Sequence, residues 1–217
     1  MISLVVLDIA GTTVDEKNAV YDVLAAVVAD HGTPADDAAL RRWMGADKRE
    51  ALAALTGDPD AVEALHADFV SRLHDTYAAL RPAPLPGVPE ALAALRAAGV
   101  CVALTTGFDR QVTDPLLTAL HWRVGEELDA VVCASEVPAG RPTPHMIHKA
   151  MELVGVTDPA EVLVAGDTAL DIRAGRAARA GVVAGVLTGA QTREELTAEE
   201  PTHILDGVAD IPALLGV

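Results

Sequence analysis

The stretch that decides the fold is Leu4–Asp15, which reads LVVLDIAGTTVD. Its apolar residues Leu4 to Leu7 run without alternation into Asp8, as expected of a strand buried on both faces of a parallel sheet. The glycine and threonines that follow can bring backbone N–H groups close to an anion. A carboxylate at the end of a buried strand is costly unless a metal or a substrate uses it. The alternative is a strand followed by a simple turn that Asp8 stabilises.

Composition and charge narrow the class of protein. The 217 residues suffice for one good core and a small appended domain. A formal net charge of −16 argues against nucleic acid or an anionic membrane as the partner. Cys101 and Cys133 lie in apolar runs typical of buried thiols in a reducing compartment. Since we find no signal-peptide pattern and no apolar run near 18 residues, we expect a soluble, cytoplasmic protein that acts on a small molecule.

The chain divides into two kinds of sequence. Residues 1–15 and 84–217 alternate strands with helices, which predicts an α/β core with a doubly wound parallel sheet. Residues 16–83 have helical periodicity and predict an inserted α-helical domain, with one helix starting at Thr33-Pro34 and another after Asp58-Pro59. An earlier helix, ended by Gly32, has an apolar stripe that could fill the helical domain or pair with a second subunit as a homodimer: Val20, Leu24, Val27 and Val28.

Polar residues follow successive predicted strands of the sheet. They are Asp8, Thr105, Thr106, Arg141, Asp167 and Asp171. Because the carboxyl ends of parallel strands share one edge, we expect these side chains to meet in a single crevice. Asp167 and Asp171 lie four residues apart across a strand-to-helix turn, so both could face one cation, and oxygen ligands with water suit Mg²⁺. Taken alone, Asp167 is equally well explained as a helix N-cap.

The four motifs DxxGTT, a hydroxyl after the second strand, GRPxP and GDTxxD together resemble the haloacid dehalogenase-like hydrolases along the whole chain. The helical insert is similar to the cap domain of that family. The resemblance implies that Asp8 attacks phosphorus and forms an aspartyl phosphate. It implies that Mg²⁺ is held by Asp8, the Ala10 carbonyl and Asp167, with Asp171 in support. The groups that it implies for binding phosphoryl oxygens are Thr105 or Thr106, Gly107 and Arg141.

Ala10 departs from the usual phosphatases of that family, in which a second Asp at this position protonates the leaving alkoxide. An alanine methyl cannot do so, and the loss would be roughly 10²–10⁴-fold for an ordinary ester. With MGxxK and VPAGRPxPxM added, the motifs resemble the phosphonoacetaldehyde hydrolases, in which a cap lysine forms a Schiff base with the substrate aldehyde. Carbon–phosphorus cleavage then expels an enamine, which needs no proton from position 10. The resemblance therefore implies a catalytic role for Lys48.

The sequence does not decide the state of Lys48. A helix N-terminus at Asp47 favours the neutral amine, whereas the neighbouring acids favour the ammonium, and the alternative is an ordinary solvated lysine. The site also departs from the phosphonoacetaldehyde hydrolase pattern, because Ala51, Phe108 and Asn18 replace a histidine, a tyrosine and a cysteine. Histidines without ligand spacing, such as His66, are expected at the surface.

Three functions follow from these patterns. The first is a Mg²⁺-dependent hydrolase that cleaves a C–P bond through Asp8 and a Schiff base on Lys48. The second is a phosphatase that acts on a small phosphate ester without the second acid. The third is a non-catalytic phosphate-binding regulatory protein, which is disfavoured by the joint presence of Asp8, Arg141, Asp167 and Asp171.

Overall fold

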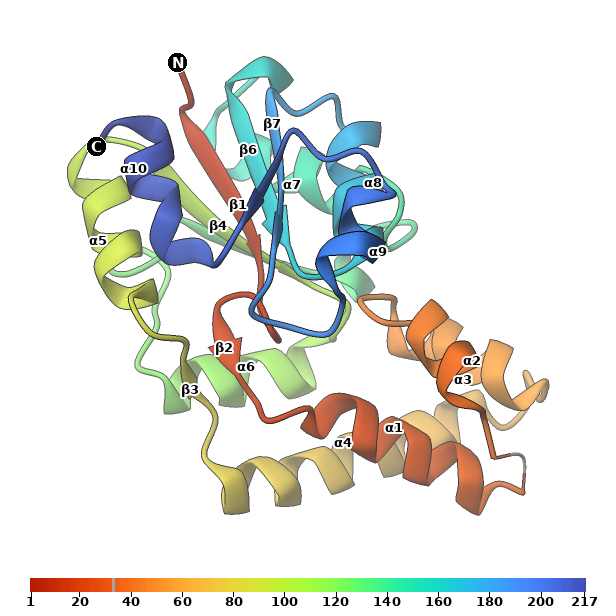
Figure 1. The fold of residues 1–217 in the computed structure, drawn as a ribbon. Helices are drawn as coiled ribbons and strands as arrows, with labels where there is room; N and C mark the ends of the chain where they lie inside the picture. The colour runs from red at the N-terminus through yellow and green to blue at the C-terminus, as the bar shows by residue number, and fades with distance from the viewer. Residues whose placement is uncertain (33) are drawn as a thin grey trace.

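The computed structural model describes residues 1–32 and 34–217, and its main element is a parallel sheet (Figure 1). In the described chain the strand order is β5-β4-β1-β6-β7-β8, and every pairing is parallel. The strands are β1 (Leu4–Asp8), β4 (Cys101–Thr106), β5 (Ala130–Cys133), β6 (Val162–Gly166), β7 (Val182–Val186) and β8 (His203–Leu205). The register aligns Asp8 with Thr105, so the first two predicted strand ends lie side by side.

Helices cover both faces of this sheet, which confirms the predicted doubly wound α/β fold. Figure 1 shows α5 and α10 on one side, and α7, α8 and α9 on the other. The bounds are α5 (Val88–Ala97), α6 (Arg110–Ala119), α7 (His145–Val154), α8 (Ala169–Ala177), α9 (Arg193–Thr197) and α10 (Ile211–Leu215), with short 3₁₀ turns at 134–136, 159–161 and 208–210. None of the described helices is long and apolar enough to span a bilayer.

The remaining helices form a separate layer at the carboxyl edge of the sheet. They are α1 (Ala19–Asp30), α2 (Asp37–Arg42), α3 (Lys48–Thr56) and α4 (Val62–Leu80). The predicted apolar stripe of α1 is buried within this layer with Phe69 and Leu73 of α4, so it is not available to a second subunit. The two segments that connect the sheet with the helical layer pair as an antiparallel ribbon, β2 (Val14–Asp15) with β3 (Ala83–Pro84). The division into domains at residues 15/16 and 83/84 stays a prediction.

Three local predictions need correction. The second helix begins at Asp37 and not at Pro34, because Asp36 is its N-cap and accepts the Ala39 N–H at 2.7 Å; Thr33 lies outside the described residues. Helix α4 begins at Val62, because Asp58 first closes a turn by accepting backbone N–H groups of the next residues. Cys101 is only partly buried, as the first residue of its strand, although Cys133 is buried as expected and both thiols are free.

Candidate active site

Asp8 is the last residue of the central strand, and its side chain is enclosed. It is 7% exposed, and its carbonyl accepts the Thr13 hydroxyl at 2.9 Å, which fixes the turn after the strand. Burial raises the pKa of Asp8 to about 8; nearby Asp171 and Asp167 act in the same direction, while Arg141 opposes them. A residue that only stabilises a turn would not need its charged form to be disfavoured in this way. The raised pKa of Asp8 therefore points to a chemical role.

Arg141 joins three of the predicted strand ends. Its Nη1 donates to Asp8 Oδ1 at 2.7 Å, and its Nε lies 2.9 Å from Asp171 Oδ1. Its Nη2 donates to the Thr105 hydroxyl at 2.8 Å and to the Thr105 carbonyl at 3.0 Å. The guanidinium is 4% exposed, so one buried cation faces two buried carboxylates. This fork fixes the orientation of the nucleophile candidate.

Asp167 is not the helix cap that the sequence allowed. Thr168 caps α8, and Asp171 completes the capping box by accepting the Thr168 hydroxyl at 2.6 Å and its N–H at 3.1 Å. The Asp167 carboxylate instead accepts the Thr12 hydroxyl and the Ala190 N–H, each at 2.8 Å. Burial raises the pKa of Asp167 to about 6, with Asp171 as the next cause. Asp171 thus turns toward Arg141 and its own helix.

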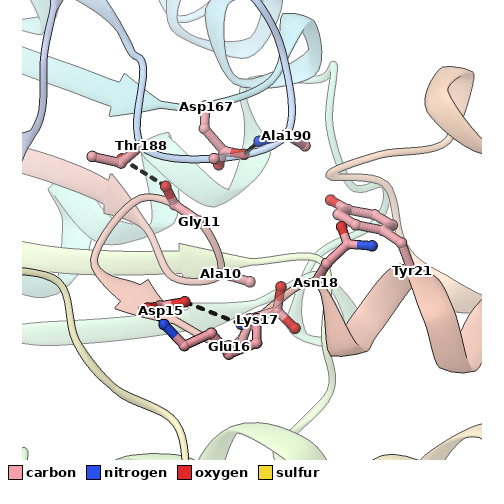
Figure 2. Close-up of a pocket in the computed structure, with 11 residues that line it drawn as sticks. Ala10, Gly11, Asp15, Glu16, Lys17, Asn18, Tyr21, Asp167, Thr188 and Ala190 are labelled. Carbon is pink, nitrogen blue, oxygen red and sulfur yellow. Dashed lines mark hydrogen bonds and ion pairs between the residues drawn. The ribbon is translucent and has the colours of Figure 1, made fainter.

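A cavity of about 150 Å³ lies between the turn after β1 and the start of α1 (Figure 2). Ala10, Glu16, Tyr21 and Asp167 are among its lining residues. Within residues 1–32 and 34–217, no group of three or more His, Cys, Asp or Glu side chains is arranged to hold a metal ion. A cation here would therefore depend on fewer carboxylates together with carbonyl and water oxygens, as Mg²⁺ commonly does.

The loop before α3 lies directly on the carboxyl edge of the sheet. A Cβ placed on Gly107 would lie 2.3 Å from the Ala46 carbonyl oxygen, so the two backbones are in contact. On the same side, Arg141 Nη1 lies 3.4 Å from the Gly45 carbonyl oxygen. Only a glycine at position 107 permits this approach. The loop therefore covers the predicted phosphate-binding residues.

Lys48 directly follows this loop and is a buried lysine, not a solvated one. It is 4% exposed, its Nζ donates to the Ala46 carbonyl at 2.9 Å, and the amine lies 5.5 Å from the centroid of the Phe108 ring. Burial lowers the pKa of Lys48 to about 8, while the charges of Asp47 and Asp8 act in the opposite direction. The structure thus gives the direction that the sequence left open, and a neutral amine is within reach near neutral pH.

Sequence reasoning missed several buried polar residues around this site. His66 is 4% exposed and lies 3.5 Å from Asp109, so its expected place at the surface was wrong. Glu16 is 5% exposed, and the buried hydroxyl of Tyr77 has no hydrogen-bond partner within residues 1–32 and 34–217. A charged residue directly before a helix start was the only available signal for Glu16. Nothing in the sequence distinguishes His66, whereas Tyr77 continues the apolar face of its helix, which predicts its burial.

With this geometry established, comparison with known proteins identifies the class. The family model for haloacid dehalogenase-like hydrolases matches residues 2–179. The chain belongs to the haloacid dehalogenase-like hydrolases, and it is an enzyme of the hydrolase class.

Different relatives are named after different activities. The chain is 32% identical to a phosphonoacetaldehyde hydrolase of Bacteroides fragilis, over 94% of this chain and 82% of that protein. It is 31% identical to a phosphoglycolate phosphatase of Pseudomonas putida, over 98% of this chain and 78% of the relative. In fold it resembles the crystal structure of a phosphonoacetaldehyde hydrolase-like protein from Oleispira antarctica, with a TM-score of 0.83, 22% identity and coverage of 99% and 91% of the two chains. The resemblance to phosphonoacetaldehyde hydrolases is confirmed, while the reaction is a separate question.

Proposed function

We propose that this chain is a Mg²⁺-dependent hydrolase that converts phosphonoacetaldehyde, or a related small phosphonate, to phosphate and an aldehyde. The observation that carries the proposal is the buried Lys48 amine, whose pKa is lowered to about 8. A neutral amine is the form that attacks an aldehyde. The proposal also has support from the phosphonoacetaldehyde hydrolase that matches most of the chain.

The proposed chemistry begins with a Schiff base between Lys48 and the substrate aldehyde. Asp8 then attacks phosphorus, the C–P bond breaks, and its electron pair moves into the iminium to leave an enamine on Lys48. Arg141, fixed by its contacts with Asp8 and Thr105, reduces the repulsion between the carboxylate and the anionic phosphoryl group. Thr106 and the Gly107 amide would bind the remaining phosphoryl oxygens.

The donor set near Asp8 fits Mg²⁺. The Ala10 and Asp167 residues line one cavity, and Asp8 lies two residues before Ala10. Asp8, the Ala10 carbonyl and Asp167 would hold the ion, while Asp171 would act in support by fixing Arg141. When bound, Mg²⁺ would supply positive charge that offsets the phosphoryl oxygens. Residues 16–83 would act as the cap that brings Lys48 to this edge of the sheet.

The decisive experiment measures phosphate release from a panel of small phosphonates and phosphate esters, with borohydride trapping of the Schiff base. We expect phosphonoacetaldehyde to be cleaved and Lys48 to be the trapped residue. The Lys48→Arg variant should lose both signals. Lys149→Arg is the matched control, because this lysine is 41% exposed and pairs only with Glu152 in the described contacts. Trapping that persists in Lys48→Arg would contradict the proposal.

A phosphatase acting on a small ester is the second candidate, because a phosphoglycolate phosphatase matches nearly as well. In that case Lys48→Arg should keep most ester hydrolysis, and phosphonates should be inert. A non-catalytic phosphate-binding role is the third. It predicts that neither substrate class releases phosphate and that beryllofluoride forms no adduct at Asp8.

A further inference from the structure

Glu16 is a buried acid in the same cavity as Ala10. It lies between β2 and α1, where the chain leaves the sheet for the helical layer, and it is 5% exposed. Its Oε2 accepts the Val20 N–H at 2.8 Å, which holds the carboxylate at the start of α1. Figure 2 draws Ala10, Glu16 and Asp167 around one cavity. This cavity of about 150 Å³ has room for water, which needs only about 10–15 Å³.

The charges around Glu16 suit a proton acceptor. Burial raises the pKa of Glu16, and Asp22 and Asp15 act in the same direction. The negative charge of Glu16 also acts on two helices of the helical layer. It opposes the lowering of the Lys48 pKa in α3 and contributes to the raised pKa of the Tyr77 phenol in α4. A carboxylate with a raised pKa is a stronger base than an exposed one.

Other groups lining the cavity are less suited to accept a proton. Asp15 forms an ion pair with Lys17 at the rim. The pKa of Tyr21 is raised well above its ordinary value by burial and nearby acids, so the phenol stays protonated. Asp167 already accepts two hydrogen bonds and is a proposed metal ligand. Glu16 is the remaining carboxylate that is both buried and free of a cationic partner among the described ion pairs.

We propose that Glu16 is the catalytic base that removes a proton from the water that hydrolyses the aspartyl phosphate. Ala10 cannot have this role because its side chain cannot accept a proton. This inference rests on the proposed function. Water forms a new P–O bond, the bond from phosphorus to Asp8 breaks, and the proton moves to Glu16. Glu16 then passes that proton to the enamine carbon on Lys48, which becomes an iminium that water hydrolyses to the aldehyde. Over one turnover, water supplies OH to phosphorus and H to carbon.

The alternative is that Glu16 only caps α1, and Glu16→Gln separates the two roles because glutamine can still accept the Val20 N–H. We expect Glu16→Gln to keep the wild-type Tm and to lose about 10²-fold or more in steady-state phosphate release. The control for the capping contact is Glu136→Gln, since Glu136 Oε2 accepts the Cys133 N–H at the same 2.8 Å outside this cavity, where Glu136 also pairs with Arg110.

Mass spectrometry of protein quenched during turnover of phosphonoacetaldehyde gives the deciding readout. Because C–P cleavage needs no proton from Glu16, we expect Glu16→Gln to accumulate about one phosphoryl group per chain on Asp8. Wild-type turnover in Glu16→Gln would show that the residue only caps the helix. Lost activity without the phosphoryl adduct would place Glu16 in another step and refute the inference. If the wild-type protein releases no phosphate from the phosphonate, the C–P proposal fails first and this inference with it.

Discussion

Replacing Gly107 by alanine tests how closely the loop before α3 approaches the sheet edge. The added Cβ would lie 2.3 Å from the Ala46 carbonyl oxygen, where an ordinary contact needs about 3.5 Å. The loop must therefore retreat by about 1 Å, since the obstructing atom belongs to the backbone. Lys48 follows two residues after Ala46, so the amine moves with the loop. A misplacement of this size typically costs about 10²-fold, and we expect that loss in kcat/KM for phosphate release.

Gly140→Ala is the matched control for this change. A Cβ on Gly140 would make ordinary contacts of 3.6 Å with Ala134 and Asp47, so the same methyl group fits at the same boundary. Neither glycine has a left-handed backbone, so alanine adds no conformational strain at either position. Steady-state kinetics and urea unfolding of both variants decide the result. Equal kcat/KM in the two variants would refute the inferred contact between loop and sheet edge.

Three further predictions follow from the buried charges. Arg141→Ala leaves the Asp8 and Asp171 carboxylates unpaired, so we expect the free energy of unfolding to fall by about 3–5 kcal/mol in urea titrations; an unchanged value would mean that the pairs do not form. Burial lowers the pKa of Lys48 from 10.5 in the unfolded chain to about 8 in the folded one. Between these pH values the unfolded chain binds more protons, so the free energy of unfolding increases as the pH rises from about 8 to 10.5. Lys48→Met should therefore be more stable than wild type by about 3 kcal/mol at pH 7 and should lack that rise, as measured by chemical unfolding at pH 7 and pH 10. Chelation with EDTA should abolish phosphate release, Mg²⁺ should restore it, and full activity in EDTA would exclude the proposed ion.

Much of the fold follows from local sequence. Unbroken apolar runs such as Leu4–Leu7 favour strands covered on both faces, as β1 is. A glycine such as Gly57 marks the end of a helix, as it does for α3. The start of α2 was misplaced because Thr33-Pro34 and Asp36 are both good helix starts. Local sequence does not rank two such signals, and the contacts of the folded helix select Asp36.

The site was predictable to the extent that topology positions it. Parallel strands bring Asp8 and Thr105 together at adjacent ends, and the structure aligns them in register. The burial of Lys48 and His66 was not predictable, because it depends on how helices α3 and α4 lie against the sheet. His66, for example, is buried beside Asp109, which lies more than forty positions away in the chain. Such contacts leave no periodic signal in the sequence.

The buried charges at this edge of the sheet are a cost to stability, so a reason other than folding must retain them. Replacing a buried ion pair by apolar residues of similar volume is often neutral or stabilising, and the pKa values of Asp8 and Lys48 are shifted against their charged forms. The proposed C–P cleavage would need this arrangement, because the Asp8 carboxylate and a neutral Lys48 amine must both be available at one site.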